Sequence, residues 1–187
     1  MKLYIFLLLF LSSICVNSQI FTLTNKGFFD SDNIENDYVV IDSLSKGQSE
    51  LYSDILVNIN SMYSSPKDVI SYVTDKSITI NAISPKSITF NSFYKYDLNY
   101  TITFLFKDGK IRINSPTINY ISGTFGSIDN VKILNLTGGG SSWGSESAIF
   151  NKKGELKGKK QKKELEIFFD TLISKILLAT KNDKDDW

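Results

Sequence analysis

The chain of 187 residues contains 21 basic and 20 acidic side chains, one cysteine and no histidine. This balance of charge provides no global attraction to nucleic acid or to an anionic membrane. The absence of histidine excludes a Ser-His-Asp triad, a Cys-His pair and the usual zinc sites.

The first residues have the pattern of a secretory signal peptide. Lys2 precedes the apolar run of residues 3–11, which is too short to span a bilayer because a spanning helix needs about 20 apolar residues. Val16-Asn17-Ser18 then presents the short side chains that signal peptidase prefers. We therefore predict a signal peptide over residues 1–18 and cleavage between Ser18 and Gln19. The mature protein is expected in the periplasm or outside the cell, without a stable transmembrane anchor.

Two alternatives are open for this segment. The apolar run of residues 3–11 could pack as a buried helix, although neither face of it is polar. Cys15 could instead carry a lipid, although the bulky Ile14 stands where a lipoprotein site has a small residue. Cleavage before Gln19 removes the only cysteine, so the mature chain forms no disulfide. Its length of about 170 residues is sufficient for one domain with its own core.

The mature chain is expected to begin with a poorly ordered segment. Residues 19–37 combine two small apolar clusters with a polar run, and we expect a flexible leader or an edge segment there. A single domain is expected over residues 38–180. Its first strand is Tyr38–Ile41, a short run of β-branched and aromatic residues.

A helix is expected after this strand. Ser45-Lys46-Gly47-Gln48 fits a capping box, which predicts the start of the helix. An apolar stripe at helical spacing then provides a face that can cover a sheet: Leu51, Ile55, Ile59 and Met62. Pro66 ends the helix, because a residue before proline disfavours the helical region.

Five strand-like runs follow, separated by turn residues: 69–73, 77–83, 87–93, 100–106 and 110–120. Asp108-Gly109 suits a two-residue type I′ turn. If Lys107 pairs with Lys110, then Phe106 faces Ile111 and Phe104 faces Ile113. This register places these apolar side chains, with Ile102, on one side, as a sheet with one covered face requires.

Residues 122–151 are rich in glycine and serine, which predicts a mobile loop. Gly139, Gly140 and Trp143 lie at its centre, and we predict that these three residues contact a ligand or partner. A phosphate-binding loop is not expected, because no Gly-Lys-Ser/Thr follows the glycines.

A second helix is expected after the lysine-rich residues 152–163. Its broad apolar stripe consists of Leu165, Phe168, Phe169, Leu172, Ile173, Ile176 and Leu177. A charged tail over residues 181–187 ends the chain. The order of strand, helix, several strands and helix predicts an α+β fold. We expect an antiparallel sheet of about five or six strands with two helices packed on one face, in the order β-α-β-β-β-β-α.

Four segments together carry a resemblance to a known family: Val39-Val40-Ile41 before Ser45, Glu50-Leu51-Tyr52 opening a helix, Asp68-Val69-Ile70 after it, and Lys107-Asp108-Gly109-Lys110-Ile111-Arg112 in a hairpin. Their pattern and order resemble small exported proteins, abundant in the Bacteroidetes, that share a domain of unknown function with a TBP-like fold. The resemblance covers residues 38–120 and the last helix. Met62-Tyr63 stands where the family usually ends an aromatic-rich helix with Trp. The resemblance implies a fold and an exported location, and it brings no catalytic residues.

These observations favour a non-catalytic envelope protein. We expect a module that binds another envelope protein or a surface polymer, through the exposed sheet face or the Trp143 loop. One alternative is a carrier that holds a small apolar ligand between the helices and the sheet. A second is a hydrolase with two facing carboxylates. No catalytic residue, cofactor or metal site is predicted. The acidic clusters, Asp30 with Asp32 and Asp183 with Asp185 and Asp186, lack the spacing of a calcium loop. The lysines of residues 152–163 lack interleaved aromatic residues, so nucleic acid is not an expected partner.

Overall fold

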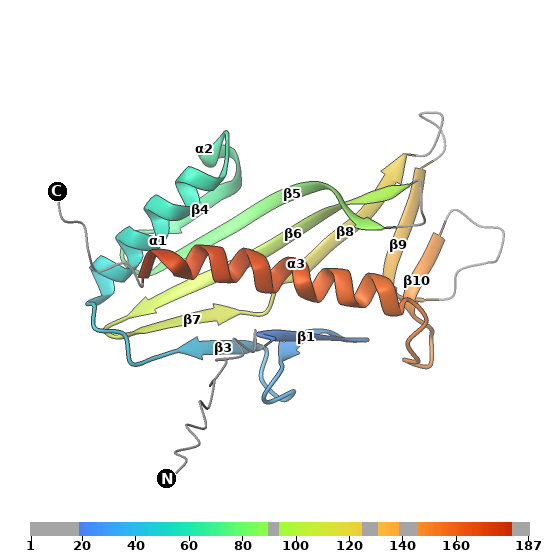
Figure 1. Ribbon diagram of the computed structural model, residues 1–187, viewed down its shortest axis with the longest axis horizontal. Helices are drawn as coiled ribbons and strands as arrows, with labels where there is room; N and C mark the ends of the chain where they lie inside the picture. Colours follow the sequence, from blue (N-terminus) through green and yellow to red (C-terminus); the bar gives the residue numbers. More distant parts are fainter. Residues whose placement is uncertain (1–18, 90–93, 125–130, 139–145, 181–187) are drawn as a thin grey trace, which may run out of the picture.

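The elements follow the order of an α+β protein (Figure 1). A computed structural model describes residues 19–89, 94–124, 131–138 and 146–180. The strands in these ranges are β1 (Phe21–Thr24), β2 (Gly27–Asp30), β3 (Tyr38–Ile41), β4 (Ile70–Val73), β5 (Ser77–Thr89), β6 (Lys95–Lys107), β7 (Lys110–Asn114), β8 (Thr117–Thr124), β9 (Val131–Thr137) and β10 (Glu146–Phe150). The helices are α1 (Gln48–Met62), α2 (Pro66–Val69) and α3 (Lys159–Leu177), with a 3-10 turn, Leu178–Thr180, after α3.

The main sheet is organised around the long strands β5 and β6. β4, β5 and β6 are antiparallel neighbours. On the other side of β6, its first half pairs with β8 and its second half pairs with β7. The sheet continues from β8 to β9 and β10, and from β7 to β3. β9 and β10 are parallel, whereas the other pairs are antiparallel.

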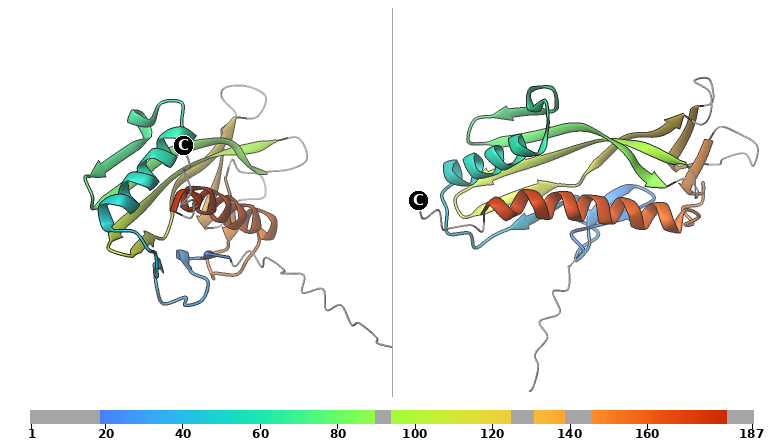
Figure 2. Two further views of the ribbon diagram at one scale, coloured as in Figure 1. Left: turned by 60° about the vertical axis from the view of Figure 1, so that its left-hand side comes forward. Right: turned by 45° about the horizontal axis from the view of Figure 1, so that its top comes forward.

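One face of this sheet carries the core. Alternate residues of β6, from Tyr96 to Phe106, are at most 3% exposed. They pack against α1, where Ile55 and Ile59 are fully buried, and against α3, where Phe169 is fully buried. Figure 2 shows both helices on the same side of the sheet, which confirms the expected architecture. Within the described residues, no helix combines the length and the apolar character that crossing a membrane requires.

The Asp108-Gly109 turn joins β6 to β7 in the predicted register. Phe106 pairs with Ile111, and Phe104 pairs with Ile113. All four side chains are buried on the covered face. The alternation of apolar and polar residues along β6 and β7 therefore predicted correctly which face of the sheet is covered.

The predicted capping box is wrong in its chemistry, although the helix begins where it was expected. α1 starts at Gln48 with Gly47 at the N-cap, and neither Ser45 nor Gln48 makes the reciprocal side-chain contacts. The backbone N–H of Gln48 instead donates to Oδ1 of Asp108, at 2.8 Å. A carboxylate from the β6–β7 turn, distant in sequence, therefore satisfies an N–H group of the first helical turn.

The prediction of a flexible leader over residues 19–37 is also wrong. β1 and β2 form an antiparallel hairpin whose residues Phe21, Leu23 and Phe28 are at most 3% exposed. The Phe28 ring meets Phe169 of α3 edge to face, with centroids 5.0 Å apart. The apolar clusters of this segment complete the core beside α3, so it is an integral part of the domain.

The glycine- and serine-rich region is a loop only in part. β8 reaches Thr124, and the strands β9 and β10 lie between residues 122 and 151. β10 ends in Ile149 and Phe150, which are buried.

The runs predicted at 77–83 and 87–93 join into β5, with a register shift between Ser84 and Ile88. Within the described residues, the main sheet has eight strands instead of the expected five or six.

Candidate functional site

The face of the sheet that turns away from the helices carries a row of uncharged polar side chains. We call this row the polar strip, and it consists of Thr79, Asn81, Asn99, Thr101, Thr103 and Asn119. These residues belong to three neighbouring strands, β5, β6 and β8. They are exposed or half-buried, whereas the residues that alternate with them, such as Ile80 and Ile102, are buried. The strip is therefore the outward side of the strands that build the core.

Hydrogen bonds connect the side chains of the polar strip to one another. The hydroxyls of Thr79 and Thr103, which pair across β5 and β6, are 3.0 Å apart. The Thr101 hydroxyl donates to the Asn81 amide oxygen on the same pair of strands. Such contacts restrict side-chain rotation before any ligand arrives, which lowers the entropy cost of binding.

A bulge brings Asn119 into the strip. Asn99 pairs with Tyr120, but the next residue of β6, Tyr100, pairs with Ile118, so Asn119 is an extra residue of β8. Its amide nitrogen donates to Oδ1 of Asn99, at 2.8 Å, and to the hydroxyl of Thr101, at 3.1 Å. Bulges commonly re-aim a side chain, and here the bulge adds an amide to the outward face.

Partly exposed apolar side chains adjoin the strip at Asn99, because Ile83 pairs with Asn99 across β5 and β6 and Tyr120 pairs with it across β6 and β8. Ile83 is 56% exposed, Tyr120 is 46% exposed and Val40 is 43% exposed. Arg112 lies over the ring of Tyr38, 3.8 Å from its centroid. The face thus combines amides and hydroxyls with partly exposed apolar side chains, two of which flank Asn99.

Most of the residues predicted from the sequence as contact or cleavage sites lie outside the described residues. Gly139, Gly140, Trp143 and Ser18 are among them. Gln19 is described, and its side-chain amide donates to the backbone oxygen of Phe21, at 2.9 Å.

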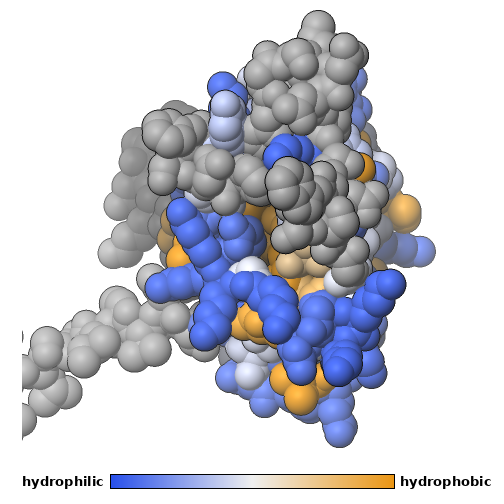
Figure 3. Space-filling model, turned by 90° about the vertical axis from the view of Figure 1, so that its right-hand side faces the viewer, coloured by the Kyte–Doolittle hydropathy of each residue, from blue (hydrophilic) through white to orange (hydrophobic). Residues whose placement is uncertain are grey.

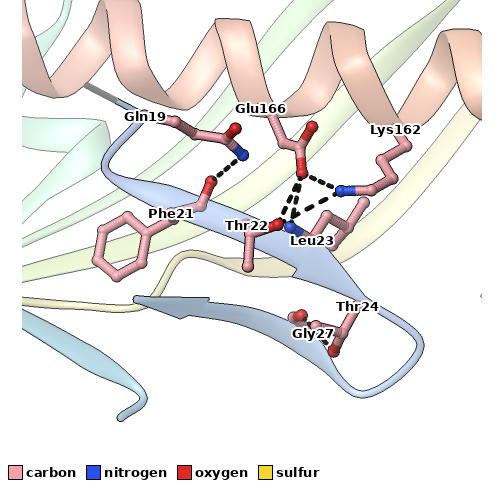
Figure 4. Close-up of polar contacts among 8 residues, drawn as sticks. All are labelled: Gln19, Phe21, Thr22, Leu23, Thr24, Gly27, Lys162 and Glu166. Carbon is pink, nitrogen blue, oxygen red and sulfur yellow. Dashed lines mark hydrogen bonds and ion pairs between the residues drawn. The ribbon is translucent and has the colours of Figure 1, made fainter. Parts of the chain in front are cut away.

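Beside Gln19, a carboxylate of α3 holds the first strand (Figure 4). Oε1 of Glu166 accepts hydrogen bonds from the Leu23 backbone N–H, at 2.9 Å, and from the Thr22 hydroxyl, at 3.2 Å. The ammonium of Lys162 contacts the same oxygen. Glu166 therefore satisfies an N–H group on the side of β1 that faces α3.

A hollow of about 740 Å³ runs along this side of α3 and contains a pair of carboxylates, Glu166 and Asp170. Oδ1 of Asp170 accepts the backbone N–H of Ile20, at 2.9 Å. Burial raises the pKa of Asp170, and the charge of Glu166 raises it further, against the effect of the hydrogen bonds. Both carboxylates therefore serve as acceptors for the backbone of the N-terminal hairpin.

The space between the helices and the sheet is filled by side chains. Tyr100 of β6 packs edge to face on Phe168 and Phe169, and its hydroxyl lies 3.0 Å from that of Tyr63. Burial raises the pKa of both tyrosines. Ile55, Ile59 and Phe169 are fully buried in the same layer, so the described side chains around Tyr100 are closely packed.

The polar strip was not identified from the sequence, although a signal for it exists. Thr79 and Asn81 alternate with the buried residues of β5, and Asn99, Thr101 and Thr103 alternate with those of β6. The alternation predicts an outward polar face. It does not predict that β5, β6 and β8 are neighbours, nor that a bulge adds Asn119.

Comparisons with known proteins agree with the architecture. Residues 38–121 match the model of a family described as a domain of unknown function (DUF4468) with TBP-like fold. No curated protein matches the sequence.

Two solved structures have a similar fold. A TBP-like protein from Parabacteroides distasonis ATCC 8503 has a TM-score of 0.58 and 13% sequence identity, covering 79% of this chain and 92% of its own. A DUF4468 family protein from Bacteroides ovatus ATCC 8483 has a TM-score of 0.51 and 14% identity, covering 80% and 87%. At these identities the likeness shows the fold alone. Together with the family match, it confirms the resemblance expected from the sequence: residues 38–121 are similar to the DUF4468 family, and the fold is TBP-like.

Proposed function

We propose that this protein is an exported, non-catalytic envelope protein that binds a neutral polysaccharide through the polar strip. The observation that carries the proposal is the strip itself, two hydrogen-bonded groups of amides and hydroxyls on a sheet face that no described helix covers. Sugar hydroxyls are both donors and acceptors, so side-chain amides and hydroxyls are suitable partners for them. The strip contains no charged side chain, which favours a neutral polymer over an ionic one.

The distribution of apolar residues favours a polysaccharide over a protein. Specific protein interfaces have an apolar centre and a polar rim. The open face differs, because the polar residues Asn119 and Thr101 lie in the middle of the strip, while Ile83 and Tyr120 flank Asn99 at one end of it. Tyr120 lies next to Asn119 and is partly exposed, so its ring is available to stack on a sugar.

A titration tests the binding proposal. Soluble neutral oligosaccharides of several linkage types are added to isotopically labelled protein, and backbone amide shifts are recorded by NMR. We expect shifts on β5, β6 and β8. Asn119→Ala should weaken binding about five- to tenfold, because it removes one side-chain hydrogen-bond partner.

Asn60→Ala is the matched control, because Asn60 is an exposed asparagine on α1, the other side of the sheet. It should leave the affinity unchanged. Shifts confined to the helices, or equal weakening by the two substitutions, would contradict the role of the strip.

Export is a separate part of the proposal, supported by the signal-peptide pattern of residues 1–18. The protein is expressed in a bacterial host, cell fractions are separated, and the N-terminus is determined by mass spectrometry. We expect protein outside the cytoplasm that begins at Gln19. A chain that retains residues 1–18, or one with a lipid on Cys15, would refute cleavage at Ser18.

A further inference from the structure

Charge is strongly segregated along the mature chain, although the total is balanced. Residues 151–163 contain seven lysines and one glutamate, a net charge of +6. Residues 19–150 together with 164–187 contain 13 basic and 19 acidic side chains, a net charge of −6. The near-neutral total therefore conceals a basic region at one end of the molecule, where residues 151–158 lead into α3.

Three of the seven lysines are paired with glutamates. Lys157 lies 3.3 Å from Glu155, Lys160 lies 4.0 Å from Glu164, and Lys162 contacts Glu166. The side chains of the other four make no ion pair or hydrogen bond with the described part of the chain. We call these four the basic patch: Lys152, Lys153, Lys159 and Lys163. All four are exposed.

Four of the five lysines of α3, at positions 159, 160, 162 and 163, stand at the N-terminal end of the helix, where cations are least favourable. The N-terminus of a helix carries a partial positive charge, and acidic residues normally occupy its first turn. α3 has no acidic residue in its first turn, which instead contains Lys159 and Lys160. Figure 3 looks onto this end and shows hydrophilic side chains projecting from the described surface. An external anion would offset the electrostatic cost of this arrangement.

We infer that the basic patch docks onto a membrane surface rich in anionic phospholipids. The lysine ammonium acts as a point charge and can attract any nearby headgroup phosphate. Unlike arginine, it does not require the fixed geometry of a bidentate contact. The patch has no arginine and no aromatic residue, so it lacks the stacking groups that nucleic-acid surfaces use. Lysine is also depleted at the centres of protein interfaces. Exposed lysines on a projecting end suit a planar, charged partner.

Vesicle binding tests this inference with the chain of residues 19–187, which contains every described element. Partition is measured by co-sedimentation with vesicles of phosphatidylglycerol and phosphatidylcholine, and with vesicles of phosphatidylcholine alone. We expect binding to the anionic vesicles that weakens as salt is added. Each lysine of the patch should contribute roughly a fivefold increase in partition. Reversal of all four lysines to glutamate should therefore lower partition by several hundred-fold or more.

The matched control substitutes glutamate for four exposed lysines elsewhere on the molecule: Lys67, Lys76, Lys107 and Lys110. This variant has the same change in net charge, and its partition should stay within about threefold of the original because distant charges are screened. Equal losses in the two variants would overturn the inference, as would equal binding to the two kinds of vesicle. If the reversal variant does not fold, lysine-to-glutamine substitution at the same four positions gives the same comparison. Tighter binding to a labelled oligonucleotide than to the anionic vesicles would also overturn it.

Discussion

Glu166 is the residue whose contacts best explain how the N-terminal hairpin is held. It accepts the backbone N–H of Leu23 and the hydroxyl of Thr22 from a position that is 12% exposed. Glu166→Ala leaves the Leu23 N–H without its acceptor, so we expect the free energy of unfolding to fall by about 1–3 kcal/mol. Urea unfolding followed by circular dichroism measures the loss.

Two substitutions serve as controls for this prediction. Glu166→Gln retains an acceptor oxygen and should cost less than the alanine substitution. Glu155→Ala removes a glutamate that is 60% exposed, and it should change stability by less than about 0.5 kcal/mol. Equal losses for Glu166→Ala and Glu155→Ala would show that the contact with β1 is unimportant.

Asp170, one turn along α3, should have the opposite effect when its charge is removed. Burial raises the pKa of this carboxyl, so the native state binds its proton more tightly than the unfolded chain does. Protonation therefore stabilises the fold as the pH falls through the raised pKa, and the ionised group is a net cost at neutral pH. Asp170→Asn keeps an acceptor for the Ile20 N–H and removes the charge.

We accordingly expect Asp170→Asn to have the same melting temperature as the natural protein at neutral pH, or a higher one. The difference should shrink as the pH is lowered through the raised pKa of Asp170, where the natural residue also becomes neutral. Thermal unfolding at a series of pH values provides the comparison. A variant that is clearly less stable at neutral pH would mean that the ionised carboxylate stabilises the hairpin.

At the scale of elements, the β6–β7 turn fixes two parts of the fold at once. Gly109 has φ of +66°, a conformation that favours glycine, and a Cβ at this position would lie 3.1 Å from the backbone oxygen of Leu44. The neighbouring Asp108 accepts the N–H of Gln48. Gly109→Ala should reduce stability by about 1–2 kcal/mol, from the strain and the displaced turn together. Denaturant unfolding tests this value, and an unchanged midpoint would contradict it.

The elements that the sequence predicted well are those set by local patterns. The face and register of the Asp108-Gly109 hairpin follow from alternation and from a two-residue turn, and both are as predicted. α1 likewise follows from its apolar stripe. The short strands β1, β9 and β10 were missed because their stability comes from distant partners. β1 depends on Glu166 and Phe169, which no local pattern in residues 19–37 reveals.

At the scale of the whole molecule, the polar strip also could not be predicted from local sequence patterns. Its residues were visible as the outward positions of β5 and β6, but its chemistry depends on strand order and on the bulge at Asn119. The basic patch, in contrast, is a single run of sequence, and the structure adds that three of its neighbours are neutralised by glutamates. A polymer-binding face and a membrane-docking end would use different surfaces of the molecule, the outward face of the sheet and the start of α3.

The whole domain is larger than the family match over residues 38–121, because its core includes side chains from both flanks. Six of these are at most 2% exposed: Phe21, Leu23, Leu165, Phe169, Ile173 and Ile176. At roughly 2 kcal/mol for each buried side chain, their loss approaches the entire stability of a typical domain. A fragment of residues 38–121 would also expose the apolar residues of β5 and β6 that α3 covers. We therefore expect this fragment to show poorly dispersed NMR spectra, strong binding of an apolar dye and no cooperative thermal transition. The chain of residues 19–187 should behave as a folded domain under the same conditions. A fragment that unfolded cooperatively would show that α1 and the sheet alone suffice, and that α3 with the N-terminal hairpin is an accessory to the fold.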